Sequence, residues 1–243
     1  MSAHKFSAER APGANMLKTR FDPKAKTAMR ILPFLAVIFT CGSMAAPAAA
    51  HPHVWIDLQT EAHVDADGRL AAVTIVWIFD EFYSAFALDG LEKPGGNYKP
   101  EDLAALTDVN MTNLAEFNYF TEVTQGGEPA AFGEPRDAHS TWNEESGRLT
   151  LAFTLPIADP RTATAETPAA YRVYDPSYYI SIDYTEKDPL RIVGETAARC
   201  ESAIETPNVE NVWTTLPESA FTGQSQMGAM FAATATLTCR TAE

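Results

Sequence analysis

Two histidines one residue apart are the first residues in this chain whose types and spacing could do chemistry. They open the run His51-Pro52-His53-Val54-Trp55-Ile56-Asp57. In an extended chain, residues i and i+2 point to the same side, about 6.6 Å apart at roughly 3.3 Å of rise per residue. Pro52 favours extension, because the residue before a proline is biased towards β or polyproline geometry. Two such imidazoles are typical of half a zinc or copper site. The alternative is a pair of polar residues at the start of a strand.

A β-hairpin is predicted to bring a carboxylate to the same side as these histidines. The run from Val54 and the run from Arg69 to Asp80 both alternate apolar and polar residues, with the turn signal Asp65-Ala66-Asp67-Gly68 between them. A four-residue loop and a two-residue loop both place His53 and Asp80 on one face. The other face carries the apolar side chains and is expected to enter the core.

The residues before His51 have the layout of a secretory signal peptide. A short apolar run, residues 31–41, follows scattered Lys and Arg and leads through small residues to Ala48-Ala49-Ala50. This run is too short to span a bilayer as a mature helix. Met16 and Met29 are alternative starts for the segment, which we place at residues 1–50. Cleavage next to Ala50 would leave His51 at or beside the mature N-terminus.

Removing residues 1–50 makes the chain strongly acidic. Residues 51–243 hold 11 basic and 30 acidic residues, a formal net charge of −19. Such a surface repels nucleic acid and attracts cations, so we expect no nucleic-acid partner. The two cysteines in this part, Cys200 and Cys239, are predicted to form a disulfide, because an even pair in an exported chain is most simply bridged.

Residues 51–243 are expected to form one α+β domain with a mainly antiparallel sheet and two or three helices. After Asp80 the pattern changes to a helical period marked by Phe82 and Phe86, and acidic residues at a helix start suit its dipole. A second helix is predicted at 100–116. Further predictions are a strand at 119–124, a hairpin of 138–144 with 148–155, strands at 171–174, 179–184 and 190–193, an irregular segment at 205–217, a short helix at 219–231 and a closing strand at 232–239.

The chain resembles the DUF1007 family of exported bacterial proteins, often described as periplasmic components of an uncharacterised ABC-type transport system. The resemblance implies a periplasmic protein that accompanies nickel/cobalt-type (NicO/RcnA-like) membrane permeases, and some members appear in zinc acquisition. It also implies a ligand role for Asp175. Many relatives carry an EF-hand-like loop after the first helix, but residues 91–97 here lack its spaced aspartates. The resemblance rests on the motifs at 51–57, 79–86, 108–110, 116–121 and 173–178.

The residues and the resemblance together predict a divalent-cation site made by His51, His53 and Asp80, with Glu81 or Asp175 as a fourth ligand. Imidazole with carboxylate suits zinc, and also nickel, cobalt and copper(II). We therefore expect a non-enzymatic, metal-binding accessory or solute-binding protein of a membrane metal transporter, because no triad or paired-carboxylate motif for hydrolysis stands out. Two alternatives remain. One is a copper protein that uses the amino group and imidazole of His51 as a histidine brace, and the other is a structural or assembly protein without metal.

Overall fold

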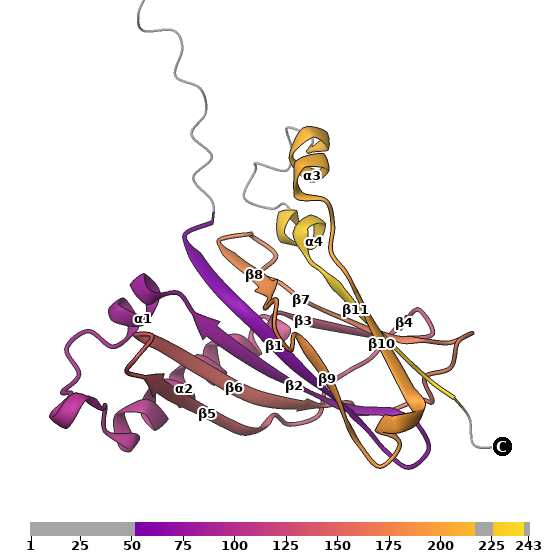
Figure 1. Cartoon of the computed structure of the whole chain (residues 1–243), viewed down its shortest axis with the longest axis horizontal. Helices are drawn as coiled ribbons and strands as arrows, with labels where there is room; N and C mark the ends of the chain where they lie inside the picture. The colour runs from indigo at the N-terminus through magenta and orange to yellow at the C-terminus, as the bar shows by residue number, and fades with distance from the viewer. Residues whose placement is uncertain (1–51, 217–225, 241–243) are drawn as a thin grey trace, which may run out of the picture. The chain divides into compact units, whose positions relative to one another are not determined.

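In the computed structural model, which describes residues 52–216 and 226–240, the larger β-sheet is organised around strand β1 (Val54–Val64). Buried and less buried residues alternate along β1, as the sequence pattern predicts, so one face of the strand enters the core. The strand order is β5-β6-β2-β1-β8, and β9 also pairs with β1 (Figure 1). The bounds are β2 (Leu70–Phe79), β5 (Arg136–Asn143), β6 (Arg148–Pro156), β8 (Ile180–Tyr184) and β9 (Leu190–Gly194).

Strand β1 is hydrogen-bonded along both edges. One edge pairs antiparallel with β2. The other edge pairs in parallel with β8 over residues 54–58 and with β9 over residues 60–64. These parallel partners lie more than a hundred residues further along the chain, so they are not βαβ units, and the sheet remains mainly antiparallel.

A second sheet, with all its pairs antiparallel, shares the core with the first. Thr60 of β1 is hydrogen-bonded at 2.8 Å to the hydroxyl of Tyr171 in this sheet, and both residues are buried. The rings of Trp77 and Phe120 lie 6.2 Å apart. The strand order is β10-β11-β7-β3-β4, with β3 (Thr121–Gln125), β4 (Glu128–Pro129), β7 (Ala169–Val173), β10 (Cys200–Glu205) and β11 (Thr234–Cys239).

The described residues contain four α-helices, against the two or three expected. Two of them follow the first hairpin, as predicted: α1 (Glu81–Ala87) and α2 (Pro100–Ala115). The segment expected to be irregular holds α3 (Val209–Thr215), which Asn208 caps by accepting a hydrogen bond from the backbone of Asn211. The last is α4 (Met227–Phe231), inside the range predicted to be helical; residues 217–225 lie outside the described part. The α+β class is confirmed.

The loop of the first hairpin, residues 66–68 between Asp65 and Arg69, matches neither loop length expected from the sequence. Asp65 and Arg69 close the turn, and the ladder shifts by one residue between His63 and Val64. This β-bulge gives the rest of the ladder the register expected for the two-residue loop, in which Ile56 pairs with Phe79. The backbone of Asp80 consequently lies opposite Trp55, and the apolar residues of both strands share the core face as predicted.

Phe82 and Phe86, which mark the helical period of α1 in the sequence, do not form its buried face. Both side chains are exposed, whereas Ser84 and Leu88 are buried. Asp80 is the one residue between the end of β2 and the start of the helix, and as the helix cap it fixes which side meets the sheet. That side carries Ser84 and Leu88.

The predicted signal segment, residues 1–50, and the first histidine, His51, lie outside the described residues. Within the described part, no helix is both long enough and apolar enough to cross a membrane.

The predicted disulfide between Cys200 and Cys239 is present, with the two sulfurs 2.03 Å apart. The two cysteines face each other across β10 and β11, where the ladder pairs them directly. The bridge joins the last strand of the chain to the strand before it.

We expect the double variant Cys200→Ser, Cys239→Ser to lose about 2–4 kcal/mol in the free energy of unfolding, because the bridge closes a long loop in the unfolded chain. Guanidinium unfolding followed by circular dichroism measures this loss. Reducing agent should destabilise the parent and leave the double variant unchanged. Equal stability of parent and variant under oxidising conditions would contradict a structural role for the bridge.

Candidate functional site

Three of the sequence motifs meet at the end of the larger sheet where β1 begins. The backbone N–H of His53 donates to the carbonyl of Tyr179 at 2.9 Å, and the two rings have centroids 4.8 Å apart. On the other edge of β1, the backbone N–H of Asp80 donates to the carbonyl of Trp55 at 2.9 Å. The segment leading into β8 and the end of β2 therefore flank the first residues of β1 (Figure 1).

Asp80 joins β1 to α1 through both carboxylate oxygens. Oδ1 accepts a hydrogen bond from the backbone N–H of Tyr83 at 2.9 Å, which caps the helix. Oδ2 accepts one from the backbone N–H of Trp55 at 3.0 Å. The structure thus places Asp80 near the start of β1, as predicted, but occupies its carboxylate with two backbone amides.

Asp175 lies buried in the turn after β7, where its carboxylate organises the backbone. Oδ1 accepts from the backbone N–H of Ser177 at 2.9 Å, and Oδ2 accepts from that of Ile180 at 3.0 Å. The hydroxyl of Ser177 lies within 2.9 Å of both oxygens. These bonds set the direction in which the chain enters β8, and β8 in turn lies beside β1.

The turn at Asp175 also receives the C-terminal helices, a role that the sequence did not reveal. Tyr178 stacks on Phe231 of α4 with ring centroids 4.2 Å apart. Gly228 donates from its backbone N–H to the carbonyl of Pro176 at 3.1 Å. A Cβ at Gly228 would lie 1.8 Å from the carbonyl oxygen of Asp175, so only glycine fits this close approach.

The remaining predicted ligands at this end are exposed. The His53 side chain is exposed at the start of β1, and Glu81 is exposed in the first turn of α1. Within residues 52–216 and 226–240, no three His, Cys, Asp or Glu side chains form a group that could hold a metal ion. His51 lies outside those ranges, so a group that includes it is neither found nor contradicted.

The two other described histidines lie elsewhere on the sheet. His63, near the far end of β1, has its Nε2 2.7 Å from the hydroxyl of Thr74, and burial lowers its pKa below the usual value. His139 is exposed on β5, the opposite edge strand, and its Nδ1 lies 2.8 Å from the carbonyl of Asp137. Neither residue comes to the start of β1.

The loop after α1 holds an ammonium group where relatives are expected to carry spaced aspartates. Lys93 forms an ion pair with Glu144 at 2.6 Å and lies over the ring of Trp142, 4.7 Å from its centroid. The hydrogen bond from Lys93 is the main reason that the pKa of Glu144 is lowered. A positive charge held in this way disfavours a cation at the same place.

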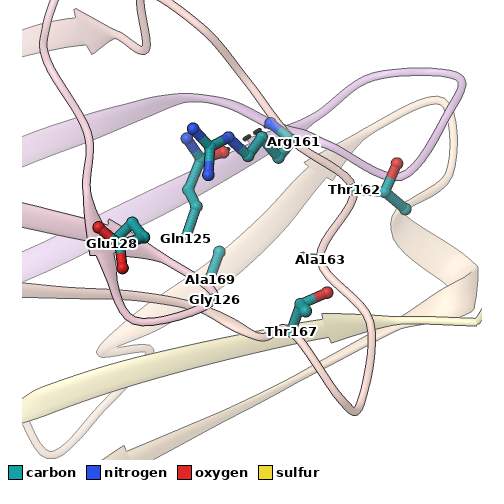
Figure 2. A pocket seen from close by; sticks show the side chains of 8 residues that line it. All are labelled: Gln125, Gly126, Glu128, Arg161, Thr162, Ala163, Thr167 and Ala169. Carbon is teal, nitrogen blue, oxygen red and sulfur yellow. Dashed lines mark hydrogen bonds between the residues drawn. The ribbon is translucent and has the colours of Figure 1, made fainter.

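A separate pocket of about 180 Å³ lies between the β3–β4 turn and the segment before β7, and Figure 2 shows the residues that line it. Gln125 spans it: its Nε2 donates to the carbonyl of Asp159 at 3.0 Å, and its Oε1 accepts from the backbone N–H of Arg161 at 2.6 Å. Because Gln125 is buried and both ends of its amide are used, it holds this segment in place. None of the predicted ligands lines this pocket.

Comparison with known proteins gives a family and one relative. A family model described as "Protein of unknown function (DUF1007)" matches residues 36–239. A protein of Haemophilus influenzae described as an uncharacterized protein is 25% identical over 194 residues, which cover 78% of this chain and 91% of the relative. Neither description states an activity, a ligand or a partner.

We expect Asp175→Ala to lower the free energy of unfolding by about 2–3 kcal/mol, because buried backbone amides would lose a charged acceptor. Urea unfolding measures this loss. The matched control is Asp183→Ala: Asp183 is exposed and accepts from the hydroxyl of Ser181 at 2.7 Å, so its loss should cost less than about 1 kcal/mol. An Asp175→Ala variant as stable as the parent, with lost zinc binding, would instead assign Asp175 to the metal.

Proposed function

We propose that this chain, which belongs to the DUF1007 family of proteins of unknown function, is a divalent-cation-binding accessory or solute-binding protein of a membrane metal transporter. The chain is proposed to act after export to the periplasm. Zinc is the first candidate cation, and nickel, cobalt and copper are the alternatives, since imidazole and carboxylate ligands suit all four. The transporter would be a NicO/RcnA-like permease or an ABC-type system.

The observation that carries this proposal is the exposed His53 side chain at the point where three sequence motifs meet. The hydrogen bond from its backbone N–H to the carbonyl of Tyr179 fixes the position of the His53 backbone, and this determines where the side chain leaves the sheet. His51 precedes it by two residues, and an extended chain would place both imidazoles on one side. A site at the exposed start of a strand is open to solvent and to a partner, as cation delivery requires.

Of the three predicted carboxylate ligands, one is exposed and two accept hydrogen bonds from backbone amides. Glu81 is exposed, and we infer that it is the acidic side chain most available to complete the site. Asp80 and Asp175 each use both oxygens for hydrogen bonds to the backbone. A carboxylate oxygen has two lone pairs, so those of Asp80 can each accept a second partner, whereas both oxygens of Asp175 also lie within 2.9 Å of the Ser177 hydroxyl. In this proposal they position β1 and its neighbours, and they join the metal only as additional ligands.

We expect purified protein to bind zinc, and the double variant His51→Ala, His53→Ala to bind it more than about 100-fold more weakly, since even indirect supports of a metal are commonly worth 10–100-fold. Competition with a chromogenic chelator measures the affinity. Affinity should fall between about pH 7 and pH 5, because protonated imidazole cannot bind a cation.

The matched control for the zinc experiment is His139→Ala, which removes an exposed histidine from the opposite edge of the sheet. It should leave zinc affinity unchanged. Glu81→Gln should weaken binding less than the histidine changes do. Zinc affinity equal to the parent in the double histidine variant would exclude this site. Strong copper preference that requires a free amino group on His51 would favour the histidine brace instead.

We expect export with cleavage next to Ala50. Mass spectrometry of the periplasmic fraction should show a chain that starts at His51 or Ala50, because small residues precede the cleavage position of a signal peptide. A variant with Ala48 and Ala50 both changed to large residues should accumulate uncleaved. An intact N-terminus recovered only from the cytoplasm would contradict the proposed location.

A further inference from the structure

Helix α1 presents its largest apolar side chains to solvent. Phe82 is 89% exposed and Phe86 is 78% exposed, while Ser84 is fully buried. Residues four apart lie on the same face of a helix, so the two phenylalanines form one apolar ridge. Folding alone would favour the reverse arrangement, with phenylalanine inside and serine outside. Exposed aromatic surface of this kind typically marks an interaction site.

The orientation of α1 is fixed by contacts on its buried side. The hydroxyl of Ser84 accepts a hydrogen bond from the backbone N–H of Leu149 at 2.9 Å, and Leu88 is 2% exposed. Tyr83 stacks on Phe79 with ring centroids 4.7 Å apart. The helix cannot turn its phenylalanines inward without losing these contacts. The exposure of the two phenylalanines is therefore fixed by the folded structure.

Trp55, near the start of β1, is a third exposed aromatic residue at this end of the sheet. Its side chain is 51% exposed, and its backbone is hydrogen-bonded to Asp80, the cap of α1. We call Trp55, Phe82 and Phe86 the aromatic ridge. Tryptophan and phenylalanine are enriched at the cores of protein interfaces, where rigid aromatic anchors enter pockets of the partner.

The rim of the aromatic ridge is acidic. Residues 70–92, which form β2, α1 and the first residues after α1, contain no Lys or Arg, and Glu81 and Asp89 are exposed next to the phenylalanines. Lys93, which follows, is paired with Glu144 at 2.6 Å. Arg148 reaches the end of β2 from β6, but its guanidinium is engaged by Asp57 at 2.6 Å and by the carbonyls of Ile78 and Phe79. Neither a second copy of this acidic face nor an anionic bilayer would match it.

We propose that the aromatic ridge docks a polypeptide surface in which apolar side chains are bordered by Lys or Arg. The inference rests on the proposed function in one respect: the partner it describes is the membrane transporter, which would be held beside the histidines at the start of β1. The aromatic side chains would contact the apolar side chains of the partner, and the acidic residues beside them would favour a partner with Lys or Arg over other surfaces.

Two synthetic amphipathic helical peptides of equal length test this proposal, one of Leu and Lys and one of Leu and Glu. Fluorescence anisotropy of the labelled peptides measures binding to the purified protein. The Leu/Lys peptide should bind at least tenfold more tightly than the Leu/Glu peptide, and salt should weaken it. The variant Phe82→Ala, Phe86→Ala should lose at least tenfold in affinity for the Leu/Lys peptide.

The matched control is Val109→Ala, which removes a 57% exposed apolar side chain from α2. It should leave peptide binding unchanged, and thermal unfolding of all variants should match the parent, because the changed side chains are mainly exposed. Failure of the parent to bind the Leu/Lys peptide, or undiminished binding by the double phenylalanine variant, would overturn the proposal. The proposal would also be overturned if the parent formed a dimer that the double phenylalanine variant does not form, because the partner would then be a second copy. Binding of the parent, but not of this variant, to phosphatidylglycerol vesicles would overturn it in favour of a bilayer.

The zinc experiment separates this inference from the proposed function. If His51→Ala, His53→Ala loses zinc and keeps peptide binding, both assignments stand as distinct parts of one surface. If the protein binds no zinc but binds the Leu/Lys peptide through Phe82 and Phe86, the metal assignment fails and the docking surface remains.

Discussion

Hydrogen bonding of β1 along both of its edges is the constraint on which the arrangement of this protein depends. The strand receives β2 on one edge and β8, then β9, on the other. Because β2 runs antiparallel to β1 and β8 runs parallel, the end of β2 and the beginning of β8 arrive at the start of β1. Motifs separated by more than a hundred residues thereby meet at one end of one sheet, beside His53.

Two carboxylates hold these segments at the start of β1. They accept hydrogen bonds from backbone amides that have no partner in the strand pairing. Asp80 binds the amides of Trp55 and Tyr83 where β2 turns into α1. Asp175 does the same for Ser177 and Ile180 where the chain enters β8. A backbone amide left without a partner on folding costs free energy, so an acidic side chain at such a junction has a structural reason to be there. Residues that look like metal ligands in the sequence can therefore serve to position the strand that follows His53.

The start of β1 combines two properties that stability alone does not explain. One is the exposed imidazole of His53, and the other is the aromatic ridge on α1 and β1, with Glu81 and Asp89 exposed beside its phenylalanines. Folding gains nothing from exposed phenylalanines on a helix that is already anchored through Ser84 and Leu88. The proposed cation site and the proposed docking surface would lie side by side, which is the arrangement expected of a protein that hands its cargo to a partner.

The sequence by itself determined the features that depend on local pattern. Alternation in β1 and β2 identified the hairpin and its core face, helical spacing identified α1 and α2, and the even pair Cys200 and Cys239 identified the disulfide. It placed His53 and Asp80 on one side, although that parity survives only because a bulge near His63 offsets the actual turn. Tertiary structure alone decided the parallel pairing of β1 with β8 and β9, the exposed side of α1 and the seating of α4 on the Asp175 turn. These depend on contacts between distant segments, and periodicity within one segment carries no information about which neighbour will cover it.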